Sequence, residues 1–216
     1  MRITFIRHAI TDWNATGRWQ GHSDTPISAL GVQQAHLLGK RLERHTFDAI
    51  YSSPLERARR TLELALLGSQ PIFEDRLKEI DFGEFEGRTY FENAAHPQFL
   101  AWLEDPYTRS TPGGESLEAV VKRMVEWLES LPPDEEGGQP EKHYLAVSHS
   151  CAIRALLSHL MHLPMVVNDG HHFPFVIQTP HTSLSRVRFR GGFWTLEQLG
   201  DVGHLEMGRE MSSVMR

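Results

Sequence analysis

Short apolar runs alternate with longer amphipathic segments along most of this 216-residue chain. Apolar runs begin at residues 3, 47 and 143, and each ends abruptly in polar residues. Such runs predict buried parallel strands. Between and after them, apolar residues recur at helical intervals over 28–44, 117–131 and 150–160, which predicts helices packed on the sheet. This alternation predicts an α/β fold with a mostly parallel central sheet.

The last quarter of the chain has a different pattern. Residues 173–177 and 182–189 are predicted to be strands, and Gly191-Gly192 forms a hairpin turn into a further strand at 193–199. The residues after Asp201 are expected to be a tail or a small docking element. We expect one domain over 1–216. Aromatic residues and prolines gather within 84–114, which indicates either an inserted helical cap that shapes a pocket or a helical hairpin that completes the core.

Composition excludes several classes of protein. The net charge of −6 and the lack of a basic block argue against nucleic acid as a partner. No run of about 18 apolar residues and no apolar signal region exist, so we expect no membrane span and a cytoplasmic location. The single cysteine, Cys151, excludes an intramolecular disulfide. A homodimer is left open.

Candidate chemistry gathers where the predicted strands end. Arg7 and His8 end the first strand, and His149 ends the third, with Ser150 as the expected cap of the next helix. After the second strand, Ser53-Pro54-Leu55-Glu56 predicts a capping box that starts a helix at Pro54 and places Arg57 one turn in. Because the carboxyl ends of parallel strands meet at one sheet edge, these side chains should share one crevice, where guanidiniums favour phosphate.

Three further residues are candidates for that crevice. Asn14 and Gln20, in a polar loop expected over 12–28, could offer amide donors to an anion. Glu79 lies among apolar neighbours, and burial favours a protonated carboxyl group that can act as a general acid. Glu84 and Glu86 are expected at the surface. His171, His172 and His181 lack further ligands at suggestive spacing, so we expect no metal site and no cofactor.

Six segments resemble the histidine phosphatase (phosphoglycerate mutase-like) superfamily, in the family's order and over nearly the whole chain. They are FIRHAITDWN, GRWQG, SSPLERARRT, LKEIDFGEFEG, TPGGES and AVSHS. The resemblance implies a three-layer α/β/α fold of the phosphoglycerate mutase type. The short middle segment and DFGEFEG resemble the phosphatase branch.

The resemblance also implies roles for individual residues. His8 would be the nucleophile that becomes phosphorylated, while Arg7, Arg57 and His149 complete the phosphate pocket. Asn14 would contact the phosphate, Gln20 would lie near the substrate, and Glu79 would donate and accept the proton. The expected function is hydrolysis of a small phosphate monoester without a metal, with His149 protonated beside the phosphate dianion.

Two departures and two alternatives accompany this hypothesis. The family's usual glycines after the two histidines are Ala9 and Ser150 here, and a position that needs positive φ would resist both residues. A phosphoglycerate-type mutase is the alternative enzyme, and a phospholigand-binding sensor without turnover is the alternative of another class. A cysteine-dependent phosphatase is disfavoured, because Arg154 follows Cys151 too closely to return from a phosphate-binding loop.

Overall fold

The computed structural model describes residues 1–134, 141–164 and 176–206. Six strands form one sheet in the order β3-β2-β4-β1-β5-β6. Their bounds are Arg2–Arg7 (β1), Ala49–Ser52 (β2), Ile72–Phe73 (β3), His143–Ser148 (β4), Leu184–Arg190 (β5) and Phe193–Asp201 (β6). The first four strands are parallel, and β5 and β6 add an antiparallel hairpin beside β1. The predicted mostly parallel sheet is therefore confirmed.

The register of the central strands aligns their carboxyl ends. Arg7 at the end of β1 pairs with Ser148 at the end of β4, and Ser52 at the end of β2 pairs with Val147 of β4. The chain thus leaves all three strands at nearly the same level. The residues that follow each strand, His8, Ser53 and His149, are brought to one place by the sheet itself.

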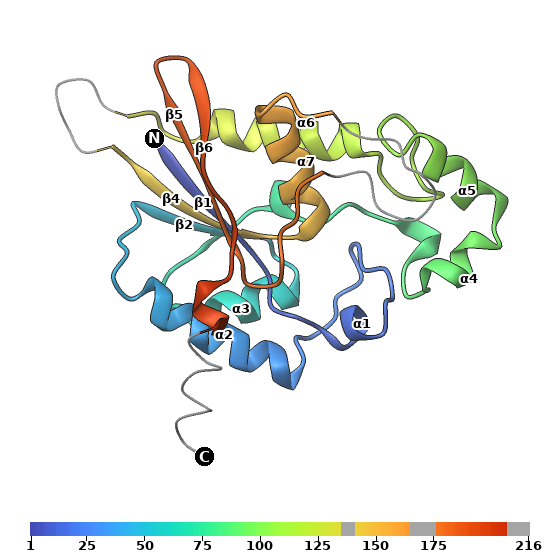
Figure 1. Ribbon diagram of the computed structural model, residues 1–216, viewed down its shortest axis with the longest axis horizontal. Coiled ribbons are helices and arrows are strands. Elements are labelled where there is room, and N and C mark those ends of the chain that lie inside the picture. The colour runs from blue at the N-terminus through green and yellow to red at the C-terminus, as the bar shows by residue number, and fades with distance from the viewer. Residues whose placement is uncertain (135–140, 165–175, 207–216) are drawn as a thin grey trace.

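Helices cover both faces of this sheet and give three layers (Figure 1). Helices α2 (Ala29–Leu42) and α3 (Glu56–Ala65) lie on one face, and α6 (Leu117–Ser130) and α7 (Ser150–Leu160) lie on the other. Side chains alternate between the faces along each strand: Phe5 packs against α6 and α7, whereas Ile6 packs against α2 and α3. The implied α/β/α arrangement is confirmed.

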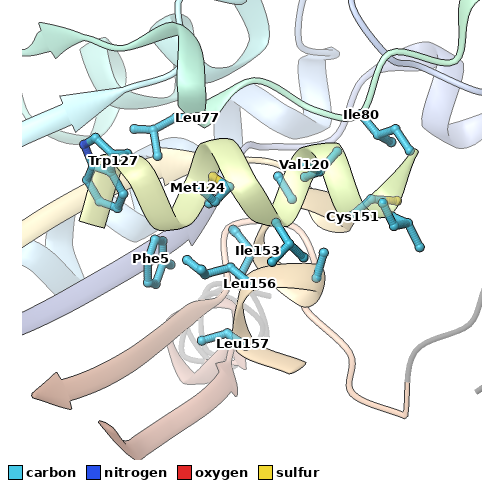
Figure 2. Close-up of a cluster of buried hydrophobic side chains, with 14 of the residues drawn as sticks. Phe5, Leu77, Ile80, Val120, Met124, Trp127, Cys151, Ile153, Leu156 and Leu157 are labelled. Carbon is cyan, nitrogen blue, oxygen red and sulfur yellow. The ribbon is translucent and has the colours of Figure 1, made fainter. Parts of the chain in front are cut away.

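The core between the sheet and helices α6 and α7 is the larger of the two. Figure 2 shows Met124 and Trp127 of α6 and Leu156 of α7 directed into one space beside Phe5. All four side chains are at most 1% exposed. Burial of large side chains of this kind stabilises a fold by about 1.5–3 kcal/mol each, so this layer fixes the position of the amino end of α7.

Two predicted helix starts are wrong. Helix α3 begins at Glu56 instead of Pro54, with Leu55 at the N-cap, because the Ser53 hydroxyl contacts His149 and the Glu56 amide donates to Asp24. Ser150 is the first residue of α7 and His149 is its N-cap. In contrast, Ser28 caps α2 and Ser116 caps α6 with side-chain oxygens, as sequences of this type favour.

Short helices occupy the segments between the main layers. They are α1 (Asp12–Ala15) in the expected loop, the 3-10 turns η1 (Asp75–Leu77) and η2 (Gly83–Phe85), and α4 (Tyr90–Ala94) and α5 (Pro97–Glu104) in the aromatic segment. Helices α4 and α5 lie at the edge of the molecule, far from the β5–β6 hairpin (Figure 1). Phe99 and Trp102 of α5 are buried in the same hydrophobic cluster as Phe5.

The predicted hairpin at 182–199 is confirmed as β5 and β6. Of the strand expected over 173–177, residues 173–175 lie outside the described residues, and Val176 and Ile177 form a bend. His171, His172 and the end of the tail also lie outside the described residues. In the part of the chain that the structure describes, no helix has the length and apolar character needed to cross a bilayer.

Candidate active site

The two histidines that end β1 and β4 lie side by side. The ring centroids of His8 and His149 are 5.0 Å apart, and both side chains are buried, at 3% and 0% exposed. The predicted meeting of the strand ends therefore takes place. It follows directly from the parallel pairing of β1 with β4.

One ring nitrogen of His8 is fixed and the other is left for chemistry. Nδ1 lies 2.8 Å from the carbonyl oxygen of Ala9, so Nδ1 carries the proton and donates it. Nε2 then holds the lone pair, which is the tautomer a nucleophile requires. Burial, and then the positive charges of Arg57 and Arg7, lower the pKa of His8 well below its ordinary value. The ring is neutral at neutral pH.

Arg57 and His149 form a buried pair behind His8. Arg57 Nε donates to His149 Nδ1 over 3.2 Å, and its terminal nitrogens donate to the carbonyl oxygens of Gly21 and Ser23 at 2.6 and 2.9 Å. Since Nδ1 accepts, the proton of His149 is on Nε2, which donates to Ser53 Oγ at 2.8 Å. Burial and Arg57 lower the pKa of His149 well below its ordinary value. The expectation of a protonated His149 is therefore wrong for this arrangement.

The Arg7 side chain is held by the segment just before β5, which contains Thr179 and His181. Its terminal nitrogens donate to the carbonyl oxygen of Thr179 at 2.8 Å and to His181 Nε2 at 3.1 Å. Among the described residues, its buried Nε has no hydrogen-bond partner. Burial and the neighbouring Arg154 lower the pKa of Arg7 to about 10, so its guanidinium remains charged at neutral pH.

Glu79 lies on the amino end of α7. Its Oε1 accepts from the amides of Ile80 and Ala152 at 3.1 and 2.9 Å, and its Oε2 accepts from the amide of Cys151 at 3.1 Å. The side chain is 5% exposed. The three amides fix the carboxyl group in place, and one lone pair on Oε2 is left over for a proton. The expected burial of Glu79 is confirmed, but the amides and the helix end were not foreseen.

The backbone around Glu79 is held by Arg123 of α6. Its guanidinium donates to the carbonyl oxygens of Arg76, Lys78 and Glu79 at 2.7–2.9 Å and binds the Glu115 carboxylate. His22 Nε2 adds a contact of 3.0 Å to the Glu79 carbonyl oxygen. Sequence reasoning missed Arg123, because an arginine on an amphipathic helix is ordinarily a surface residue.

Asn14 and Gln20 line the site, but some of their polar groups already form hydrogen bonds within the protein. Asn14 Oδ1 accepts from the Thr11 amide in the capping box of α1. Gln20 Nε2 donates to Thr11 Oγ1 and its Oε1 accepts from Thr25. The Nδ2 group of Asn14 therefore remains the better donor for an anion.

Glu86 is half-buried, which corrects its expected surface position. Its carboxylate accepts from the amides of His22, Ser23 and Phe82 at 2.7–3.2 Å. Burial acts to raise the pKa of Glu86, but these hydrogen bonds together lower it below its ordinary value. Glu86 thus fixes the loop whose carbonyl groups hold Arg57.

A cavity of about 300 Å³ opens onto these groups. It is lined by Arg7, His8, Asn14, Arg18, Trp19, Gln20, Glu79, Phe82, Ser150, Cys151 and Arg154. Five of the seven candidate residues therefore share its wall, whereas Arg57 and His149 are fully buried against His8. Guanidiniums outnumber the one carboxylate in this wall, so it favours an anion despite the acidic chain.

Ala9, Ser150, His181 and Cys151 are the remaining residues about which the sequence makes a prediction. Neither Ala9 nor Ser150 has a positive φ, so both replacements of the family's glycines fit. His181 uses both ring nitrogens in hydrogen bonds, and no group of three or more metal-ligating side chains occurs among the residues described. Burial raises the pKa of Cys151 to about 12, which leaves an unreactive thiol.

Comparisons with known proteins agree with this geometry. The chain is 31% identical to "Probable phosphoglycerate mutase GpmB" of Yersinia pestis (strain Pestoides F) over 96% of each chain. Its structure is similar to the α-ribazole phosphatase of Shigella flexneri, with a TM-score of 0.79 and 27% identity over 93% of this chain and 96% of that one. It is also similar to a phosphoserine phosphatase mutant (H9A) of Entamoeba histolytica in complex with phosphoserine, with a TM-score of 0.79 and 26% identity over 94% and 98%.

A family model covers almost the whole described fold. The model of the histidine phosphatase superfamily (branch 1) matches residues 3–202, which include both strand-end histidines and the Glu79 segment. The chain belongs to the histidine phosphatase superfamily.

Proposed function

We propose that this protein is a phosphatase that hydrolyses small phosphate monoesters through a phosphohistidine on His8. One observation carries the proposal: Nδ1 of His8 is fixed on the Ala9 carbonyl, while the ring lines a cavity that also holds Arg7 and Glu79. A nucleophile, an anion-binding cation and a proton carrier in one cavity are what phosphoryl transfer needs.

The first step transfers the phosphoryl group to His8. The lone pair of Nε2 forms a bond to phosphorus as the bond from phosphorus to the ester oxygen breaks. Arg7 binds the phosphoryl oxygens, and the buried charge of Arg57, which already acts on His8, stabilises the developing negative charge. Protonated Glu79 gives its proton from Oε2 to the departing alkoxide and becomes a carboxylate.

The second step releases the phosphate. Water attacks phosphorus, the Glu79 carboxylate takes a proton from that water, and the bond from phosphorus to Nε2 breaks with its electron pair returning to the ring. Inorganic phosphate leaves, and both His8 and Glu79 recover their starting protonation states. General acid and base assistance of this kind contributes about 10²–10⁴-fold to a rate.

The cavity also indicates which monoesters fit. A volume of about 300 Å³ is at the small end for ligand pockets. Arg18 and Arg154 add two guanidiniums to those that bind the phosphate, and Trp19 and Phe82 add aromatic surface. We therefore expect a monoester with a second anionic group, such as phosphoserine, to react faster than phosphoethanolamine, which is the same molecule without the carboxylate.

The test measures inorganic phosphate released from a panel of monoesters by the wild-type protein and by H8A. We expect release to require His8, with kcat lowered at least about 10³-fold in H8A. If the wild-type protein releases phosphate from no monoester, the proposal fails.

A mutase is the second candidate, because the curated relative at 31% identity carries that name. A mutase would move the phosphoryl group from phosphohistidine to a second hydroxyl of the substrate instead of to water. Isomerisation of 3-phosphoglycerate without phosphate release would favour it. Tight phosphate binding without either reaction would favour a sensor.

A further inference from the structure

The segment 179–183 contacts Arg7 through both its side chain and its backbone. Arg7 gives side-chain hydrogen bonds to the Thr179 carbonyl and to His181 Nε2. Its backbone carbonyl accepts from the Thr182 amide at 3.0 Å, and its backbone amide donates to the Ser183 carbonyl at 3.3 Å. Two of these four hydrogen bonds hold the guanidinium, and the other two hold the backbone that carries it.

His181 has a defined tautomer in this arrangement. Its Nδ1 lies 3.1 Å from the carbonyl oxygen of His8, so Nδ1 carries the proton and donates it. Its Nε2 then has the lone pair that accepts from Arg7. The ring is also in edge contact with the His8 ring, at a centroid distance of 5.5 Å. One imidazole thus contacts both the proposed nucleophile and its neighbouring cation.

The backbone next to His181 is fixed against local preference. Thr182 has φ 57°, in the left-handed region that a β-branched residue rarely adopts. Its Oγ1 donates to the His181 carbonyl at 2.7 Å and accepts from Nε2 of the buried His204 at 3.0 Å. A strained residue held by a buried partner is typical of a functional site.

A neutral acceptor suits a phosphate-binding arginine. Burial, and then the charge of Arg7, lower the pKa of His181 to about 3, so the ring carries no charge near neutral pH. A carboxylate at the same place would orient Arg7 equally well, but it would also compete with the phosphate dianion for the positive charge. A neutral ring orients the guanidinium and leaves its charge for the substrate.

We propose that His181 is a positioning residue: it holds Arg7 for the phosphoryl group as a neutral hydrogen-bond acceptor and takes no part in proton transfer. This inference rests on the proposed function. Because His181 lies 174 residues from Arg7 in the sequence, no local motif connects the two.

Three substitutions separate the parts of this role. In H181Q, the amide oxygen can reach the position of Nε2 and still accept from Arg7 without charge. In H181E, an oxygen reaches the same position with a negative charge. In H181N, the shorter amide keeps a donor for the His8 carbonyl but no longer reaches Arg7. His36, exposed on α2, gives the control H36N.

The measurements are kcat and KM for an aryl phosphate and the Kd of orthovanadate by calorimetry, with a thermal melt to confirm folding. We expect H181Q to retain Kd and kcat/KM within about fivefold of wild type. H181N and H181E should weaken vanadate binding and lower kcat/KM by about tenfold or more, which is the loss of roughly one charge-assisted interaction. The dependence of kcat on pH should keep its shape in H181Q.

Several results would overturn the inference. Vanadate binding by H181N and H181E as tight as that of wild type would show that Arg7 does not depend on this ring. A loss of kcat in H181Q that grows with the basicity of the leaving group would assign His181 to proton transfer. If H181N does not fold, the vanadate Kd and kcat/KM of H181Q and H181E still test whether Arg7 needs a neutral acceptor. A wild-type protein that neither binds vanadate nor releases phosphate would instead refute the proposed function, and this inference with it.

Discussion

The protein holds one ring nitrogen of His8 in a hydrogen bond, and the ring lines the cavity. The Ala9 carbonyl fixes Nδ1–H, and two buried guanidiniums and a neutral His181 surround the ring. Burial and the two guanidiniums disfavour a proton on Nε2, and together they outweigh the hydrogen bond to the Ala9 carbonyl, which alone would raise the pKa of the ring. These surroundings keep the Nε2 lone pair of His8 unprotonated, as the proposed nucleophile requires, and under the proposed function arginines instead of a histidine cation would bind the phosphate dianion.

This state of His8 can be observed directly. Because burial and nearby cations lower the pKa of His8, we expect its ring to titrate well below the ordinary range of a histidine. The measurement is an NMR titration of the imidazole signals, with His8 assigned by its absence in H8A. A midpoint near 6.5 would contradict the described surroundings.

Glu79 gives a second prediction at the same scale. The E79Q substitution keeps one of the two oxygens that accept from the α7 amides and removes the transferable proton. We expect its phosphorylation step to slow by about 10²–10⁴-fold for an alkyl phosphate and by much less for an aryl phosphate, whose leaving group needs no proton. Equal losses for both substrates would show that Glu79 is not the acid.

Helix α6 supports the site through one side chain. Arg123 binds three carbonyl groups of the segment that ends in Glu79, and Glu115 binds the guanidinium in turn. The R123M substitution should therefore lower the free energy of unfolding by about 2–4 kcal/mol. It should also slow alkyl phosphates more than aryl phosphates, since the proton donor loses its position.

The neighbouring residue on the same helix provides the control. Lys122 is exposed, so K122M changes charge and size on α6 without touching the Glu79 segment. We expect K122M to stay within about 0.5 kcal/mol of wild type. Urea unfolding and the two substrate assays check both variants, and an R123M protein as stable and active as K122M would contradict the support role of α6.

The elements that could be predicted from the sequence are those that depend on residues close together in the chain. Strands, helices and the residues at strand ends could be predicted, because apolar runs and periodicity are local. The local pattern predicts the start of α3 wrongly, because the Ser53 hydroxyl binds His149, which is 96 residues away. The contacts of Arg123 and His181 could not be predicted for the same reason. Their partners come from other parts of the chain, and no local pattern distinguishes these two residues.

For the molecule as a whole, histidines with lowered pKa values make stability depend on pH, and they include His45, His143 and His204 besides the three at the site. The pKa values of His8, His149 and His181 are depressed in the folded state. As pH falls below the unfolded value of about 6.5, the unfolded chain takes up protons that the folded protein refuses, so stability is lost. For His181, whose pKa in the folded state is lowered to about 3, the loss between pH 7 and pH 5 should be roughly 2 kcal/mol.

The H181Q variant isolates one of these contributions. It removes one titrating ring, so its stability should fall by about 2 kcal/mol less than that of wild type over the same pH range. Urea unfolding at pH 7 and pH 5 measures the difference. An equal pH dependence in both proteins would mean that His181 is protonated in the folded state.

The central claim is that the reaction proceeds through a phosphohistidine on His8. The most direct measurement is to trap this phosphohistidine. The wild-type protein is mixed with a reactive monoester, quenched in alkali within milliseconds, digested and mapped by mass spectrometry. We predict a phosphoryl group on the peptide that contains His8, stable in alkali, lost in acid and absent from H8A. Phosphate released by an H8A protein at the wild-type rate, or a phosphoryl group trapped on any other residue, would contradict the claim.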